Sequence, residues 1–328
     1  MSVEDIKKKI QKHLNSIIKI INEQEDAKTS QNLFIYAIDD LYSKVINKPQ
    51  PLQQEEKKNA DISILTWNLQ QIKEQQEKHI ERIYQMIVDL NVDIVCFQEV
   101  KEEKALIKIK SLLNKNEQGK EIWDCEYKKT GQGYQCIEIS ACFYNKSKFK
   151  LKATYYGKGN FKYTRLPQIL YLEKEGKIFT VCNFHLKDGS SGHESIQKLE
   201  QEIQNLKPLS DSLKQDEQGG NPFLILLVGD FNRNLSIEKE KYFDISSTIL
   251  GTPVESTMSQ KSIIQGKNKS DQIYDQIVAI LDNPKETTVE LKQILIDDCC
   301  NKLMNGKYVS DHLAVGFDIK FVDQKIIN

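Results

Sequence analysis

The sequence has little arginine, almost no net charge and no long hydrophobic run. Only three of its 46 basic residues are arginine (Arg82, Arg165 and Arg233), so an arginine inside a motif is not readily explained as an accident. The formal net charge is −1. The chain therefore lacks the overall positive charge that would indicate nucleic-acid binding. A polyanionic substrate would have to be met by local positive charge or by a metal ion.

Cysteine forms no CxxC pair, which argues against a structural zinc site. The seven cysteines are an odd and scattered set, which favours a reducing compartment over a disulfide framework. Four of them lie in apolar, strand-like runs, where free cysteine behaves as a small hydrophobic residue: Cys96, Cys136, Cys142 and Cys182. The adjacent Cys299 and Cys300 are interpreted as a buried or loop pair, with a redox-active pair as the alternative.

No apolar stretch reaches the length of a membrane span, and lysines interrupt residues 1–21 too often for a signal peptide. We therefore expect neither a membrane span nor a secretory signal. The expected location is the cytoplasm or the nucleus. A hydrophobic content of 39% and a charged content of 28% are ordinary for a globular protein.

Residues 1–58 have the pattern of a helical extension followed by a linker. Apolar residues recur at three- and four-residue steps over 3–21 and again over 31–46, which predicts two amphipathic helices. A stretch rich in Pro, Gln, Glu and Lys then indicates a linker. The helices within residues 1–46 are interpreted either as a docking element for a protein partner or as a brace packed on the main domain.

From residue 61 onward, short apolar runs rich in β-branched residues alternate with helical patterns or turns. The predicted strands are 62–67, 93–97, 137–144, 167–172, 178–184, 223–228, 272–281 and 313–321. The predicted helices are 76–90, 101–114 and 193–214. This mixture predicts an α/β fold with two sheets and with helices outside them.

Several predicted strands end in polar residues that a soluble strand does not usually need. They are Asn68, Glu99, His185, Asp230 and, farther along the chain, Asp275 and the run Ser310-Asp311-His312. Active sites of layered α/β proteins are built from strand ends, where rigid elements present side chains to a cleft. We therefore expect these residues to meet in one site.

The chain resembles the endonuclease/exonuclease/phosphatase superfamily over about residues 61–321, through segments that occur in this order: TWN, FQE, IEISACFYN, TRLP, NFH, GDFN, YDQIV and SDH. The region from TRLP to NFH is especially similar to the deoxyribonuclease I branch. The resemblance implies a four-layer α/β/β/α sandwich, in which two packed mixed sheets are flanked by helices. This domain would span 59–323 and follow the helical extension of 1–58. The implied activity is that of a Mg²⁺-dependent phosphodiesterase, most directly a nuclease.

The resemblance implies that Glu99 is a metal ligand, with Asn68 and Asp311 beside it. Carboxylate and amide oxygens are hard ligands that suit Mg²⁺, which keeps several waters and needs only one or two carboxylates. Mn²⁺ is the expected substitute. Such an ion would neutralise charge on the non-bridging phosphate oxygens during hydrolysis.

His185 and His312 are expected to carry the acid–base chemistry, because histidine titrates near the working pH of most enzymes. By resemblance, Glu138 would orient His185 and Asp275 would orient His312. Each carboxylate would hold the tautomer of its imidazole and stabilise the cationic form. The sequence leaves open which histidine is the base, and we favour His312.

Three further side chains are implied around the phosphate. Asp230 and Asn232 would position or activate the attacking water and contact the phosphate, and Arg165 would lie over the phosphate backbone as a planar donor. The expected substrate is a nucleic acid, with DNA ahead of RNA. Two alternatives stay open: a lipid, inositol or other small-molecule phosphoesterase on the same fold, and a non-catalytic pseudo-nuclease held in an assembly.

Overall fold

The structure of the chain is a computed structural model. It describes residues 60–115, 120–130, 138–157, 159–189, 192–216, 219–238, 243, 248–251, 273–284, 287–294 and 309–323. The predicted helical extension and linker of residues 1–58 lie outside the described residues, and so do Cys299 and Cys300.

The first sheet places six strands of the described chain in the order β11-β12-β1-β2-β4-β3. Its central neighbours β1 and β2 are parallel, and the other pairs are antiparallel. The strands are β1 (Ile62–Ile72), β2 (Ile94–Val100), β3 (Trp123–Lys129), β4 (Ile139–Asn145), β11 (Thr287–Ile294) and β12 (Val315–Asp323).

The second sheet has the order β5-β6-β7-β8-β10-β9 and again a parallel pair, β7 with β8, at its centre. Its strands are β5 (Lys150–Tyr156), β6 (Gln168–Lys174), β7 (Lys177–His185), β8 (Leu224–Asp230), β9 (Thr248–Gly251) and β10 (Asp275–Leu281). Because β7 and β8 run the same way, their carboxyl ends meet at one edge, where His185 pairs in register with Asp230.

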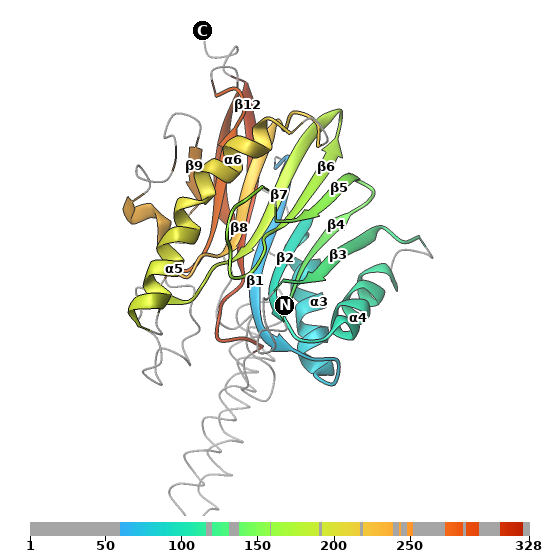
Figure 1. Ribbon diagram of the computed structural model, residues 1–328. Helices are drawn as coiled ribbons and strands as arrows, with labels where there is room; N and C mark the ends of the chain where they lie inside the picture. Colours follow the sequence, from blue (N-terminus) through green and yellow to red (C-terminus); the bar gives the residue numbers. More distant parts are fainter. Residues whose placement is uncertain are drawn as a thin grey trace, which may run out of the picture. The chain divides into compact units, whose positions relative to one another are not determined.

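Helices cover the outer faces of both sheets (Figure 1). On the first sheet lie α3 (Glu77–Leu90) and α4 (Glu103–Lys115), and on the second lie α5 (His193–Gln204) and α6 (Leu206–Lys214). A short 3₁₀ helix, η3 (Leu235–Glu238), follows β8. The predicted α/β/β/α sandwich of two mixed sheets is therefore confirmed for the described residues.

The apolar side chains between the two sheets form one continuous core. It contains Ile64, Cys96 and Cys142 from the first sheet and Leu226 and Ile277 from the second, all almost completely buried. A second core joins the outer face of the second sheet to α5 and α6. The two cysteines thus act as small hydrophobic residues, as the sequence predicts.

Two features of the fold differ from the sequence prediction. The single helix expected over 193–214 is divided into α5 and α6 at Asn205, because Pro208 has no N–H to donate to the carbonyl of Gln204. The sequence predicts none of the four edge strands: exposed polar residues interrupt the apolar pattern of β3, β5 and β11, and β9 has only four residues.

Gly229, in the GDFN segment, allows β8 to approach β7 closely. Its φ is 140°, and a Cβ at this position would lie 2.1 Å from the carbonyl oxygen of Phe184. Any side chain would therefore separate the two strands that carry His185 and Asp230.

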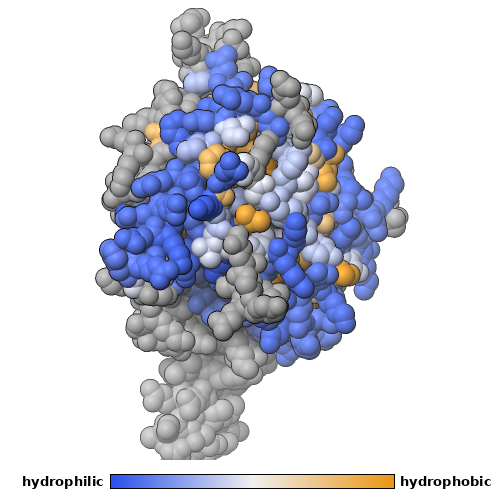
Figure 2. Space-filling model, viewed as in Figure 1, coloured by the Kyte–Doolittle hydropathy of each residue, from blue (hydrophilic) through white to orange (hydrophobic). Residues whose placement is uncertain are grey.

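The face seen in Figure 2 is largely hydrophilic. Among the residues that the structure describes, the exposed large apolar side chains occur singly on three different helices: Val88, Ile107 and Ile196. Among the described helices, none combines the length and the apolar character needed to cross a membrane.

Candidate active site

Two histidine–carboxylate pairs lie at the ends of the central strands. His185 is the last residue of β7, and its Nδ1 lies 3.0 Å from Oε1 of Glu138. His312 lies in the segment before β12, and its Nδ1 lies 2.8 Å from Oδ2 of Asp275, the first residue of β10. These are the pairs that the resemblance implies.

Both histidines face one buried carboxylate, Asp230, at the end of β8. The Nε2 atoms of His185 and His312 lie 3.8 Å and 3.7 Å from Oδ2 of Asp230, which is 1% exposed. The strand registers explain this meeting, because Asp230 pairs with His185 on one side and with Asp275 on the other. Two imidazole groups therefore converge on a single oxygen atom.

Asn68 connects the two sheets at this point. Its side-chain amide donates to Oε1 of Glu99 and to Oδ2 of Asp230, both at 3.1 Å. Glu99 lies near the end of β2 with a positive φ of 52°, and its Oε1 is 3.6 Å from Nε2 of His185. The site therefore combines residues at or near the ends of strands of both sheets with Asn68, which lies within β1.

Arg165 and Asn232 meet at the backbone that follows β7. Arg165 forms an ion pair with Glu138, and its Nη1 donates to the carbonyl oxygen of Leu186 at 3.0 Å. The side chain of Asn232 donates to the same carbonyl oxygen at 2.8 Å, and its backbone N–H donates to Oδ1 of Asp230 at 2.8 Å. Both residues are therefore held beside the two histidine–carboxylate pairs.

Charges within the site shift the pKa values of its titratable groups. Burial alone would lower the pKa of His312, but Asp275 and Asp230 raise it to about 10. Burial alone would also lower the pKa of His185, but the hydrogen bond and the negative charge of Glu138 raise it above its ordinary value. Burial would raise the pKa of Asp230, yet the two histidines hold it below its ordinary value. These shifts favour imidazolium cations beside ionised carboxylates.

Two groups of side chains in the described chain could hold a metal ion. The ligand atoms within each group lie within 4.8 Å of one another, and the groups are Glu99 with Glu138 and His185, and Asp230 with Asp275 and His312. The side chain of Glu99 is 23% exposed, so its oxygens remain open to an ion and its waters. The carboxylate oxygens of each group are the ligand type of a hard cation, whereas the imidazole nitrogen is not.

Asp311 is the predicted metal-site residue with the weakest connection to the other site residues. It belongs to neither of these groups within the described residues, although its charge contributes to the raised pKa of His312. Asn68 and Glu99, by contrast, are in direct contact.

Sequence reasoning missed a buried link between the sheets beneath the site. The side chain of Gln98 donates to Oδ1 of Asn183 at 2.7 Å, and Asn183 donates to the carbonyl oxygens of Phe97 and Ala141 at 3.0 and 3.1 Å. We call these contacts the Gln98–Asn183 link. The sequence contained a signal, because both are polar residues inside apolar runs: Gln98 directly precedes Glu99 in FQE, and Asn183 lies two residues before His185 in NFH.

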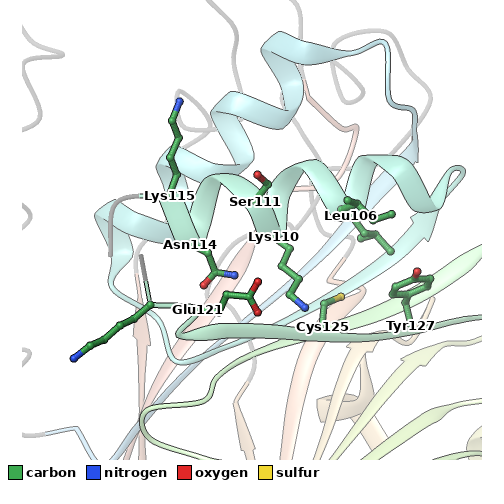
Figure 3. Close-up of a pocket in the computed structure, with 10 residues that line it drawn as sticks. Leu106, Lys110, Ser111, Asn114, Lys115, Glu121, Cys125 and Tyr127 are labelled. Atoms are coloured by element: carbon green, nitrogen blue, oxygen red, sulfur yellow. The ribbon is translucent and has the colours of Figure 1, made fainter. Parts of the chain in front are cut away.

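A hollow of about 600 Å³ lies between α4 and β3, away from the candidate site (Figure 3). Lys110 and Cys125 line this hollow, and none of the candidate site residues does. The Nζ atom of Lys110 donates to Oδ1 of Asp124 at 2.6 Å. Burial raises the pKa of the Cys125 thiol well above its ordinary value, so the thiol is not activated as a nucleophile.

No protein-family model and no curated protein sequence matches the chain. Solved structures do match it. A D. rerio TDP2 complexed with single strand DNA product is 13% identical, with a TM-score of 0.55, and the match covers 79% of this chain and 98% of that one. The human Nocturnin catalytic domain with bound sulfate anion is 19% identical, with a TM-score of 0.52 and coverages of 80% and 94%.

An endonuclease/exonuclease/phosphatase from Bacteroides vulgatus is 15% identical, with a TM-score of 0.54, and the match covers 80% of this chain and 99% of that one. At identities this low, the structural similarity establishes a shared fold and nothing beyond it. Almost the whole length of each of these structures is covered, so the similarity extends over the complete two-sheet sandwich. The chain therefore has the fold of the endonuclease/exonuclease/phosphatase superfamily, as its sequence motifs implied.

Proposed function

We propose that the chain is a Mg²⁺-dependent phosphodiesterase that hydrolyses nucleic-acid phosphodiester bonds. The observation that carries this proposal is the convergence of His185 and His312 on Oδ2 of Asp230, beside Glu99. Two proton-carrying groups on either side of a carboxylate suit the in-line displacement of one oxygen by another at phosphorus. The fold shared with Bacteroides vulgatus endonuclease/exonuclease/phosphatase supports this reaction class.

Glu99 would be the ligand of the metal ion, with Asn68 and Asp311 beside it. When bound, Mg²⁺ would neutralise charge on the phosphate oxygens. Asn68 is suited to a linking role, because its amide nitrogen contacts both Glu99 and Asp230 while its Oδ1 accepts the backbone N–H of Gln70 at 3.0 Å.

The histidines would handle the protons. His312 has a pKa of about 10, raised by Asp275 and Asp230 against the effect of burial, so it holds its proton at neutral pH. This favours His312 as a donor to a phosphate oxygen rather than as the base, which is the role that we favour for it from the sequence. We assign the positioning of the attacking water to Asp230 and the protonation of the leaving oxygen to His185.

Arg165 and Asn232 would contact the phosphate. The guanidinium of Arg165 uses Nε and Nη1 for Glu138 and the Leu186 carbonyl, and within the described residues Nη2 has no partner. A planar donor with one free edge can meet a phosphate oxygen without giving up its other contacts. The single-stranded DNA product bound to the D. rerio TDP2 supports a nucleic-acid substrate.

The test is cleavage of plasmid DNA, single-stranded DNA and RNA by the full-length protein, with Mg²⁺ or with EDTA. We expect cleavage with Mg²⁺ and none with EDTA. His185→Ala should lower the rate by about 10²–10⁴-fold. His193→Ala is the matched control, because His193 is exposed at the start of α5 and should leave the rate unchanged.

Wild-type rates for His185→Ala would contradict the assignment of its role. Absence of cleavage of all three nucleic acids would refute the nuclease proposal. Hydrolysis of a lipid or inositol phosphoester by the same protein would then identify the other branch of the reaction class.

A further inference from the structure

A buried carboxylate near the candidate site takes no part in the chemistry proposed above. Glu202 lies on α5 and is 3% exposed. It shares the inward face of this helix with Leu199 and Ile203, which belong to the core between α5, α6 and the second sheet. A carboxylate at such a position is costly unless its oxygens are hydrogen bonded.

Each oxygen of Glu202 accepts a backbone N–H from a different loop. Oε1 accepts from Thr164 at 2.5 Å, and Oε2 accepts from Lys187 at 2.7 Å. Among the described residues no cation forms an ion pair with Glu202, so these two N–H groups are its compensation. A carboxylate suits this arrangement because both of its oxygens are acceptors, whereas the glutamine side chain has one acceptor and one donor.

The two loops touch one another again at the site. Thr164 directly precedes Arg165, and Lys187 directly follows Leu186. Nη1 of Arg165 donates to the carbonyl oxygen of Leu186 at 3.0 Å, which closes a ring of contacts through Glu202. Glu202 therefore helps to fix the Arg165 guanidinium in two ways: it holds Thr164, which precedes Arg165, and it holds Lys187, which follows the carbonyl that Arg165 contacts.

Arg165 in turn forms an ion pair with Glu138, whose Oε1 also faces Nδ1 of His185 at 3.0 Å. We propose that Glu202 is a positioning residue of the site, which holds Arg165 against Glu138 and thereby sets the orientation of the His185 ring. The kinetic consequence rests on the proposed function, whereas the ordering of the two loops does not.

Amide hydrogen exchange of the full-length protein tests the ordering without any substrate. Glu202→Gln sets a donor against one of the two backbone N–H groups, so exchange should quicken in residues 161–168 and 185–189 and stay unchanged elsewhere. Glu194→Gln is the control, because Glu194 lies on the same helix, is exposed and pairs with Lys198 at 2.6 Å.

Turnover of the cleaved nucleic acid tests the consequence. Glu202→Gln should lower kcat by about 10–100-fold and change KM little, as the loss of an orienting contact does. In the Arg165→Ala background the same substitution should cost far less, because its effect runs through Arg165. If Glu202→Gln does not fold, Glu202→Asp replaces it, since the shorter side chain cannot reach both N–H groups.

Unchanged exchange in both segments would overturn the proposal, whether or not the protein is active. An equal fall in kcat with and without Arg165 would also overturn it, because Glu202 would then act independently. If the wild type cleaves no nucleic acid, the proposed function fails, and the exchange result alone decides the role of Glu202.

Discussion

Replacing Asn183 by leucine tests how strongly the Gln98–Asn183 link holds the two sheets together. Asn183 lies on β7, in the second sheet, and is 1% exposed. Its side chain bonds Gln98 and the carbonyl oxygens of Phe97 and Ala141, all three of which belong to β2 and β4 of the first sheet. Leucine has a similar size but can form none of these bonds.

The expected loss follows from these contacts. Three buried hydrogen bonds at about 1 kcal/mol each give a decrease of about 3 kcal/mol in the free energy of unfolding. Gln98 keeps its bond to Thr66 Oγ1 at 3.0 Å, so its amide nitrogen is not left unsatisfied. Urea denaturation followed by tryptophan fluorescence measures the change.

Thr180→Val provides a matched control on the same strand. Thr180 is completely buried, and its hydroxyl has no hydrogen-bond partner in the described part of the chain. Valine has nearly the same shape, so this substitution should be neutral or stabilising by about 1 kcal/mol. If Asn183→Leu stays within about 0.5 kcal/mol of the wild type, or if Thr180→Val is equally destabilising, the reasoning is refuted.

Three further predictions concern single residues. Gly229→Ala should lower the free energy of unfolding by more than about 3 kcal/mol, or abolish folding, because its Cβ would lie 2.1 Å from the Phe184 carbonyl oxygen; the same urea titration measures it. Protonated His312 should stabilise the fold fully below about pH 6.5, its unfolded pKa. This contribution should disappear as the pH rises through its folded pKa of about 10, and His312→Gln should remove that pH dependence of the urea midpoint. Cys125 should be alkylated at least about tenfold more slowly in the folded than in the unfolded protein near pH 8, because burial raises its pKa; peptide mass spectrometry gives the rates.

The central strands of the fold are predictable from the sequence because they are buried on both sides. β2, β7 and β8 are continuous apolar runs, and each corresponds to a predicted strand. The edge strand β5 alternates lysine with half-buried residues, a pattern that a turn or loop shares. Edges are therefore defined by the neighbouring strand rather than by their own composition.

The candidate site likewise contains residues that can be predicted from the sequence and residues that cannot. Glu99, His185 and Asp230 end apolar strands, and such a position is visible in the sequence. Glu202 is not visible in this way, because in the sequence it is one of several charged residues in a helix. Its role depends on Thr164 and Lys187, whose backbone N–H groups reach it only after the chain has folded.

The two bonds of Asn68 have a consequence for how activity would be lost on heating. Asn68 joins Glu99 of the first sheet to Asp230 of the second, so neither sheet alone presents a complete set of reacting groups. Any separation of the sheets would disassemble the centre before either sheet had melted. The catalytic rate would then depend closely on the spacing between the sheets. On heating, it should decline at a lower temperature than the unfolding transition that spectroscopy detects.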